Sequence, residues 1–91
     1  MTSKEFAKSL RTIGDDKRLD IFCYLIKNKK ACVSEVATQH TMSVAITSHH
    51  LKKLLSLGLV ECHKSGKEVC YTVSSSQISN DFKKLICKYL S

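Results

Sequence analysis

The chain has 91 residues, and its 15 Lys and Arg against 8 Asp and Glu give a formal net charge of +7 at pH 7. That length fits one small domain, residues 1–91, of a size that often gains stability as a homodimer, and the excess positive charge favours a polyanionic partner such as nucleic acid. The sequence has no ~20-residue apolar run, signal-peptide core, phosphate-binding glycine loop or HExxH pair, so we expect a cytoplasmic protein that is neither an enzyme nor a membrane protein.

Apolar residues at helical spacing predict two helices in the first third of the chain. The first ends at Gly14, and Asp15 or Asp16 can cap the second, which continues to the polar residues 28–30. The predicted buried faces are Phe6, Leu10 and Ile13 in the first helix and Leu19, Phe22, Leu25 and Ile26 in the second.

The middle of the chain predicts a helix-turn-helix. A short helix from about residue 33 to His40 is separated by only two residues from a longer helix that Ser43 caps and Gly58 ends. The apolar side of the longer helix would carry Ile46, His50, Leu51, Leu54, Leu55 and Leu57.

The segments LVECH and EVCYTV alternate in polarity and predict a hairpin that turns at Ser65 and Gly66. If His63 faces Glu68, one face of the hairpin carries Val60, Cys62, Val69, Tyr71 and Val73, and the other carries Cys70. A last helix has the apolar stripe Ile78, Phe82, Leu85 and Tyr89, flanked by Ile86 and Leu90.

The predicted fold is therefore mainly α with a two-stranded β-wing: four helices, the hairpin and a fifth helix, which is a winged helix-turn-helix. In this fold the second helix of the motif enters the major groove of DNA while lysines and hydroxyls hold phosphates. The predicted DNA contacts are Ser43, Val44, Thr47, Ser48, His49, Lys52 and Lys53 on that helix and His63, Lys64 and Lys67 on the hairpin. The alternative is a winged-helix module that uses the same helix to bind protein.

Three stretches resemble the ArsR/SmtB family of dimeric bacterial transcriptional repressors: DDKRLDIFCYL (15–25), SEVATQHTMSVAITSHHLKKLLSLGLV (34–60) and the hairpin through VCYTV (69–73). The resemblance covers nearly the whole chain and implies a five-helix winged homodimer joined through its first and last helices. It also implies that the protein leaves double-stranded operator DNA when an inducer binds. The chain departs from the family pattern at Thr41, where glycine is common, and at Val44, where glutamine is frequent.

The resemblance suggests two kinds of inducer. The best-known metal box of the family is a CxC pattern that begins near Cys32, but Ser34 stands at its second position, and one thiolate is too few for a soft metal. The family's other common site uses Asp, His and Glu on the last helix, where residues 78–90 contain Asp81 but no histidine. We therefore expect no metal and no cofactor, and Cys32 alone supports the alternative of a metal- or metalloid-responsive repressor.

A second branch of the family senses oxidants or reactive sulfur through one cysteine in the second helix and one in the last. RLDIFCYL resembles that branch at Cys23, and Cys87 is the candidate partner, one turn before the position expected from the resemblance. A thiolate on this basic protein would have a lowered pKa, and a Cys23–Cys87 disulfide would shift the wings. The alternative is that Cys23 is only a small buried apolar residue.

The cysteine count has its own implication. In a reducing compartment five cysteines favour free thiols, metal ligands or a redox switch over a structural disulfide. Cys62 and Cys70, on opposite faces of the hairpin, are expected to fill the strands.

Overall fold

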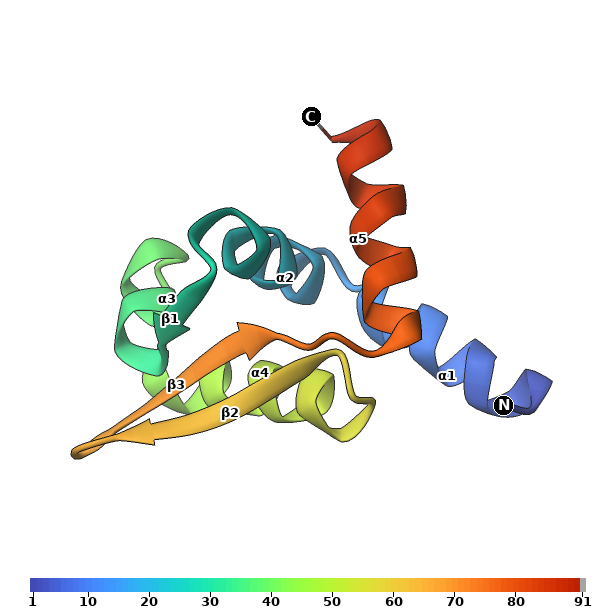
Figure 1. Cartoon of the computed structure of the whole chain (residues 1–91). Helices are drawn as coiled ribbons and strands as arrows, with labels where there is room; N and C mark the ends of the chain where they lie inside the picture. Colours follow the sequence, from blue (N-terminus) through green and yellow to red (C-terminus); the bar gives the residue numbers. More distant parts are fainter. Residues whose placement is uncertain (91) are drawn as a thin grey trace.

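The computed structural model describes residues 1–90, which form five helices and a small three-stranded sheet (Figure 1). The elements are α1 (Ser3–Ile13), α2 (Asp16–Asn28), β1 (Lys30–Cys32), α3 (Val33–Gln39), α4 (Val44–Ser56), β2 (Val60–Ser65), β3 (Glu68–Val73) and α5 (Gln77–Tyr89). This order confirms the predicted winged helix-turn-helix. Within residues 1–90, no helix has the length and apolar character needed to span a membrane.

Local side-chain contacts begin the helices where the sequence predicts. The Asp15 carboxylate accepts the Arg18 backbone N–H at 3.1 Å, and the Ser43 hydroxyl accepts that of Ile46 at 3.1 Å, so each supplies a helix N-cap. Gly58, with φ +72°, follows the C-terminal end of α4 in the left-handed region. The predicted boundaries of the helix-turn-helix are therefore confirmed.

The sheet has one strand more than the sequence predicts. Its order is β1-β3-β2, with both pairs antiparallel, so the short β1 covers the edge of β3 that the hairpin leaves open. Three residues are too few to show strand alternation in the sequence, whereas an unpaired edge of β3 readily accepts another segment. The expected two-stranded wing is thus extended at its base into a three-stranded sheet.

The register of the hairpin also differs from the predicted one. His63 faces Cys70, not Glu68, because the loop is Gly66 and Lys67 and the last pair is Ser65 with Glu68. Gly66 has φ +65°, which suits the first residue of a two-residue loop. A shift of two positions preserves the alternation, so the predicted division of the faces is correct.

The core lies between α2, α4 and β3. Among its fully buried members are Ile21, Phe22, Leu25, Val36, Leu51, Leu54 and Leu59. Two predicted positions on α4 are wrong: Ile46 is 54% exposed, and Leu55 is also exposed. Thr47 takes part in the buried face instead, because Thr47, Leu51 and Leu54 are four and three residues apart and share one face of the helix.

Three serine hydroxyls attach α5 to the end of α4. Ser74 and Ser76 donate hydrogen bonds to the Gly58 carbonyl, and the Ser79 hydroxyl donates to the Leu59 carbonyl at 2.9 Å. These bonds connect the start of the last helix directly to the turn that follows the helix-turn-helix. In Figure 1, α1 and α5 stand at the end of the molecule opposite the tip of the hairpin.

Candidate nucleic-acid interface and cysteine pairs

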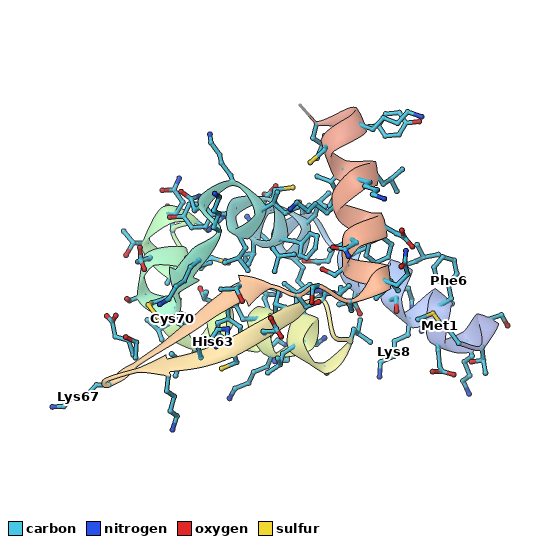
Figure 2. The ribbon with its side chains drawn as sticks, viewed as in Figure 1. Met1, Phe6, Lys8, His63, Lys67 and Cys70 are labelled. Atoms are coloured by element: carbon cyan, nitrogen blue, oxygen red, sulfur yellow. A yellow bond between two sulfur atoms is a disulfide. The ribbon has the colours of Figure 1, made fainter. Side chains whose placement is uncertain are left out.

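A cleft of 360 Å³ separates the start of α3, one face of α4 and the hairpin (β2, β3 and their loop), which we call the wing. Val44, Ser48 and Lys52 line it from α4, since residues four apart share a helix face. Lys67 and Glu68 line it from the wing. Figure 2 shows Lys67 at the wing tip, extended away from the helices. The predicted recognition helix and the predicted cationic tip therefore belong to one surface.

Most predicted DNA contacts are accessible to solvent, and Val44, Ser48, Lys52 and Lys67 among them line the cleft. Ser48 is half-buried, while the exposed residues are Ser43, Val44, His49, Lys52, Lys53, His63, Lys64 and Lys67. Thr47 is the exception: it is fully buried, and its Oγ1 has no hydrogen-bond partner among the described residues. A side chain inside the core cannot reach a base edge, so the prediction that Thr47 contacts DNA is wrong.

Sequence reasoning missed one residue that lines the cleft and two exposed residues of α4. Ala45 and Ile46 are exposed on α4, and Ser34 lines the cleft from α3. The helical spacing of α4 could have indicated that Ile46 is exposed, because a helix that buries Thr47 turns the neighbouring Ile46 toward solvent. Thr47, Leu51 and Leu54 are four and three residues apart, so helical spacing allowed Thr47 in the buried face, but the predicted face took Ile46 and Leu55 instead.

The side chain of Arg18, on α2, contacts both α1 and α4. Its Nε donates to the Thr12 carbonyl at 2.8 Å, and its Nη1 lies 3.3 Å from Nδ1 of His50. Burial, and then the Arg18 charge, lower the pKa of His50, against an opposing effect of Asp15. The half-buried His50 therefore favours its neutral form and belongs to the scaffold behind the exposed face of α4.

Cys23 and Cys87, the predicted thiol pair, line one groove of 440 Å³ between α2 and α5. Cys23 is half-buried and Cys87 is exposed, and Asp20 lines the same groove. Burial, then the Asp20 carboxylate and then Cys87, raise the pKa of the Cys23 thiol. The predicted lowering is therefore wrong, because burial and the Asp20 carboxylate both disfavour the thiolate, although the chain as a whole is basic.

Cys32 and Cys70 form a disulfide, which contradicts the expectation that the cysteines are free or act as isolated ligands. They face one another across the β1–β3 ladder, with α carbons 3.7 Å apart, and both are buried. Cys62 is free and lies on the face of the wing opposite Cys70, as predicted, but it is exposed and does not fill the strand. The pair was missed because the strand that presents Cys32 was missed.

Apolar side chains remain exposed on α1 and α5. Phe6 and Leu10 are each 46% exposed, and Leu85 and Tyr89 are 53% and 70% exposed, although Phe82 beside them is buried. Phe6, Leu10 and Leu85 line a groove of 690 Å³ between the two helices. Exposed apolar groups that are contiguous over two helices are typical of a surface that packs against another protein chain.

Comparison with known proteins agrees with this architecture. The family model described as bacterial regulatory protein, arsR family, matches residues 15–61. The cadmium resistance transcriptional regulatory protein CadC of Listeria innocua is 40% identical over 70 residues, which cover 77% of this chain and 59% of CadC. The chain thus matches about three fifths of the length of that relative.

Solved structures show the same fold along almost the entire chain. HlyU from Vibrio cholerae, described as a transcriptional activator, superposes with a TM-score of 0.83 at 28% identity, covering 98% of this chain and 96% of HlyU. The homodimeric winged helix-turn-helix DNA-binding domain of Mb0332 from Mycobacterium bovis gives 0.82 at 24% identity, covering 93% and 78%. The chain belongs to the ArsR family of bacterial regulatory proteins.

Proposed function

We propose that the chain is a homodimeric DNA-binding transcriptional repressor, released from its operator by oxidation of Cys23 and Cys87. The single observation that carries DNA binding is the shared cleft, which is lined by Lys52 of α4 and Lys67 of the wing tip. Lysines on both elements can hold phosphates while the exposed start of α4 enters the major groove. The net charge of +7 supports the same partner.

Salt-dependent binding to promoter DNA tests this part. We expect Lys52→Ala and Lys67→Ala each to weaken binding and to reduce the slope of log affinity against log salt by about 1, because each lysine releases counterions from a phosphate. Lys84→Ala, which removes an exposed lysine of α5, is the matched control and should change neither quantity. If both cleft variants bind DNA as tightly as the native chain, α4 instead serves as a protein-binding surface.

The exposed apolar faces of α1 and α5 support the dimer. Leu85→Glu places a charge in the groove between these helices, so we expect sedimentation velocity to show a monomer and DNA affinity to fall. Lys84→Glu changes the neighbouring exposed residue and should leave the dimer intact. A Leu85→Glu protein that stays dimeric would place the contact elsewhere.

The shared groove of Cys23 and Cys87 supports the release step. With an inorganic polysulfide as oxidant, the Cys23 thiolate attacks a sulfur of the polysulfide, and a shorter polysulfide leaves. The Cys87 thiolate then attacks Sγ of the Cys23 persulfide and expels hydrosulfide, which leaves a disulfide between α2 and α5. Both thiols lose their protons to water.

Mass spectrometry with DNA binding before and after polysulfide treatment tests release. We expect a Cys23–Cys87 crosslink and weaker DNA binding, whereas Cys87→Ser should stop at the Cys23 persulfide. Cys62→Ser, which changes an exposed cysteine of the wing, should behave as the native chain. A reporter gene behind the bound promoter tests repression: expression should rise when the protein is removed.

A further inference from the structure

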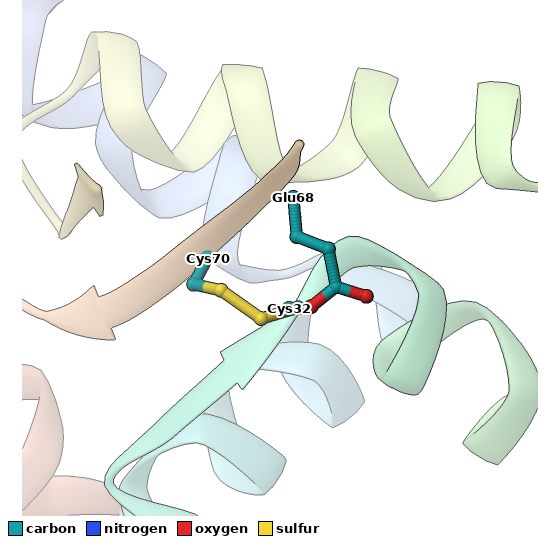
Figure 3. A group of neighbouring side chains, drawn as sticks. All are labelled: Cys32, Glu68 and Cys70. Carbon is teal, nitrogen blue, oxygen red and sulfur yellow. A yellow bond between two sulfur atoms is a disulfide. The ribbon is translucent and has the colours of Figure 1, made fainter. Parts of the chain in front are cut away.

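Three metal-ligating side chains meet where the wing joins α3. Sγ of Cys32, Sγ of Cys70 and a carboxylate oxygen of Glu68 all lie within 4.8 Å of one another. Figure 3 shows the Glu68 side chain extending from β3 toward the pair of sulfurs. The register explains the cluster: Cys32 faces Cys70 across the ladder, and Glu68 stands two residues before Cys70 on the same face of β3.

We propose that, when the Cys32–Cys70 disulfide is reduced, Cys32, Cys70 and Glu68 bind one thiophilic divalent cation, Zn²⁺ or Cd²⁺. Two thiolates select a soft cation, and a carboxylate oxygen is an accepted third ligand for zinc. The cluster borders the 360 Å³ cleft, which is also lined by Cys32 and Glu68 and has room for a fourth ligand from solvent. The site differs from a CxC box, because its second thiolate comes from the wing.

The disulfide and the metal exclude one another, because both need the same two sulfur atoms. A dithiol reductant breaks the Cys32–Cys70 bond by supplying two electrons and two protons, and it becomes a cyclic disulfide itself. Binding of the cation to the two thiols then releases their two protons. Either state links β1, at the start of α3, to the wing strand β3.

A chain that keeps only this pair of cysteines isolates the site. In the variant with Cys23→Ser, Cys62→Ser and Cys87→Ser, we expect the reduced protein to bind one Cd²⁺ per chain by equilibrium dialysis. Thiolate-to-metal charge-transfer absorption should appear in the ultraviolet. The oxidised form of the same variant has no free thiol and should bind none, which supplies a control without any further substitution.

Further substitutions separate the ligands. Cys70→Ser, added to that variant, should weaken Cd²⁺ binding by about 10-fold or more, because even the loss of groups that only support metal ligands has an effect of that size. Glu68→Gln should weaken Cd²⁺ binding less. Glu61→Gln, an exposed carboxylate of β2, is the matched control and should have no effect. Cys32→Ser should repeat the loss seen with Cys70→Ser, and circular dichroism checks that each variant is folded.

Two results would overturn this site. One is Cd²⁺ binding of equal strength in the reduced and oxidised forms of the three-serine variant. The other is unchanged affinity in folded Cys70→Ser or Cys32→Ser. Since the readout is metal bound to protein, the outcome does not depend on whether the chain binds DNA.

Discussion

Reduction of the Cys32–Cys70 disulfide should lower the stability of the fold more than any conservative surface substitution. The bond joins residues separated by 38 positions, and the loop-closure relation for such a loop gives about 3.9 kcal/mol at 25 °C. This free energy comes from the unfolded chain, whose conformational freedom the bond restricts.

The expected change in melting temperature follows from the length of the chain. For 91 residues the entropy of unfolding is roughly 190 cal/mol/K, so a loss of about 3.9 kcal/mol lowers the melting temperature by about 20 °C. The assay is thermal unfolding by circular dichroism at one fixed protein concentration, since dimerisation also affects the midpoint.

The measurement compares oxidised and reduced forms of the variant with Cys23→Ser, Cys62→Ser and Cys87→Ser, so that only the Cys32–Cys70 bond changes. A chelator keeps any metal from the reduced thiols. If the two forms unfold at the same temperature, the bond does not restrict the conformational freedom of the unfolded chain. Urea unfolding of the same pair checks the free energy directly.

Three further predictions concern single positions. Thr41 has φ +52°, a left-handed conformation that costs a β-branched residue about 1–2 kcal/mol, whereas the greater freedom of glycine in the unfolded chain offsets about 0.5–1 kcal/mol of the gain from replacing it. Thr41→Gly should therefore raise the urea midpoint of unfolding, and a lower midpoint would contradict the strain. Burial and then Asp20 raise the pKa of Cys23, so Asp20→Asn should move the pH profile of Cys23 alkylation by iodoacetamide to lower pH, whereas an unmoved profile would leave burial and Cys87 as the causes. The folded pKa of His50 is below its ordinary value, so the unfolded chain binds more protons and stability is lost as pH falls below about 6.5; His50→Gln should reduce that loss, and identical pH dependence of the urea midpoint would refute it.

The sequence by itself determined the local features of this protein. Helix caps at Asp15 and Ser43, the left-handed Gly58 and the alternation along the hairpin all depend on neighbours within a few residues. Such signals are read correctly because their physical causes, a hydrogen bond to a nearby N–H or the freedom of glycine, act within one turn. These local signals predicted the order of the helices, the wing and a surface with lysines on two elements.

The tertiary structure alone decided which residues meet across the chain. β1 is too short to show a pattern, and its partner lies 40 residues further along, so neither the strand nor the Cys32–Cys70 pair was visible in the sequence. The burial of Thr47 depends on which face of α4 packs into the core, and the spacing of its apolar residues did not determine that face. The pKa of Cys23 depends on burial of the thiol and then on the Asp20 carboxylate. The net charge averages over the whole chain, so it predicted a lowered pKa where the structure raises it.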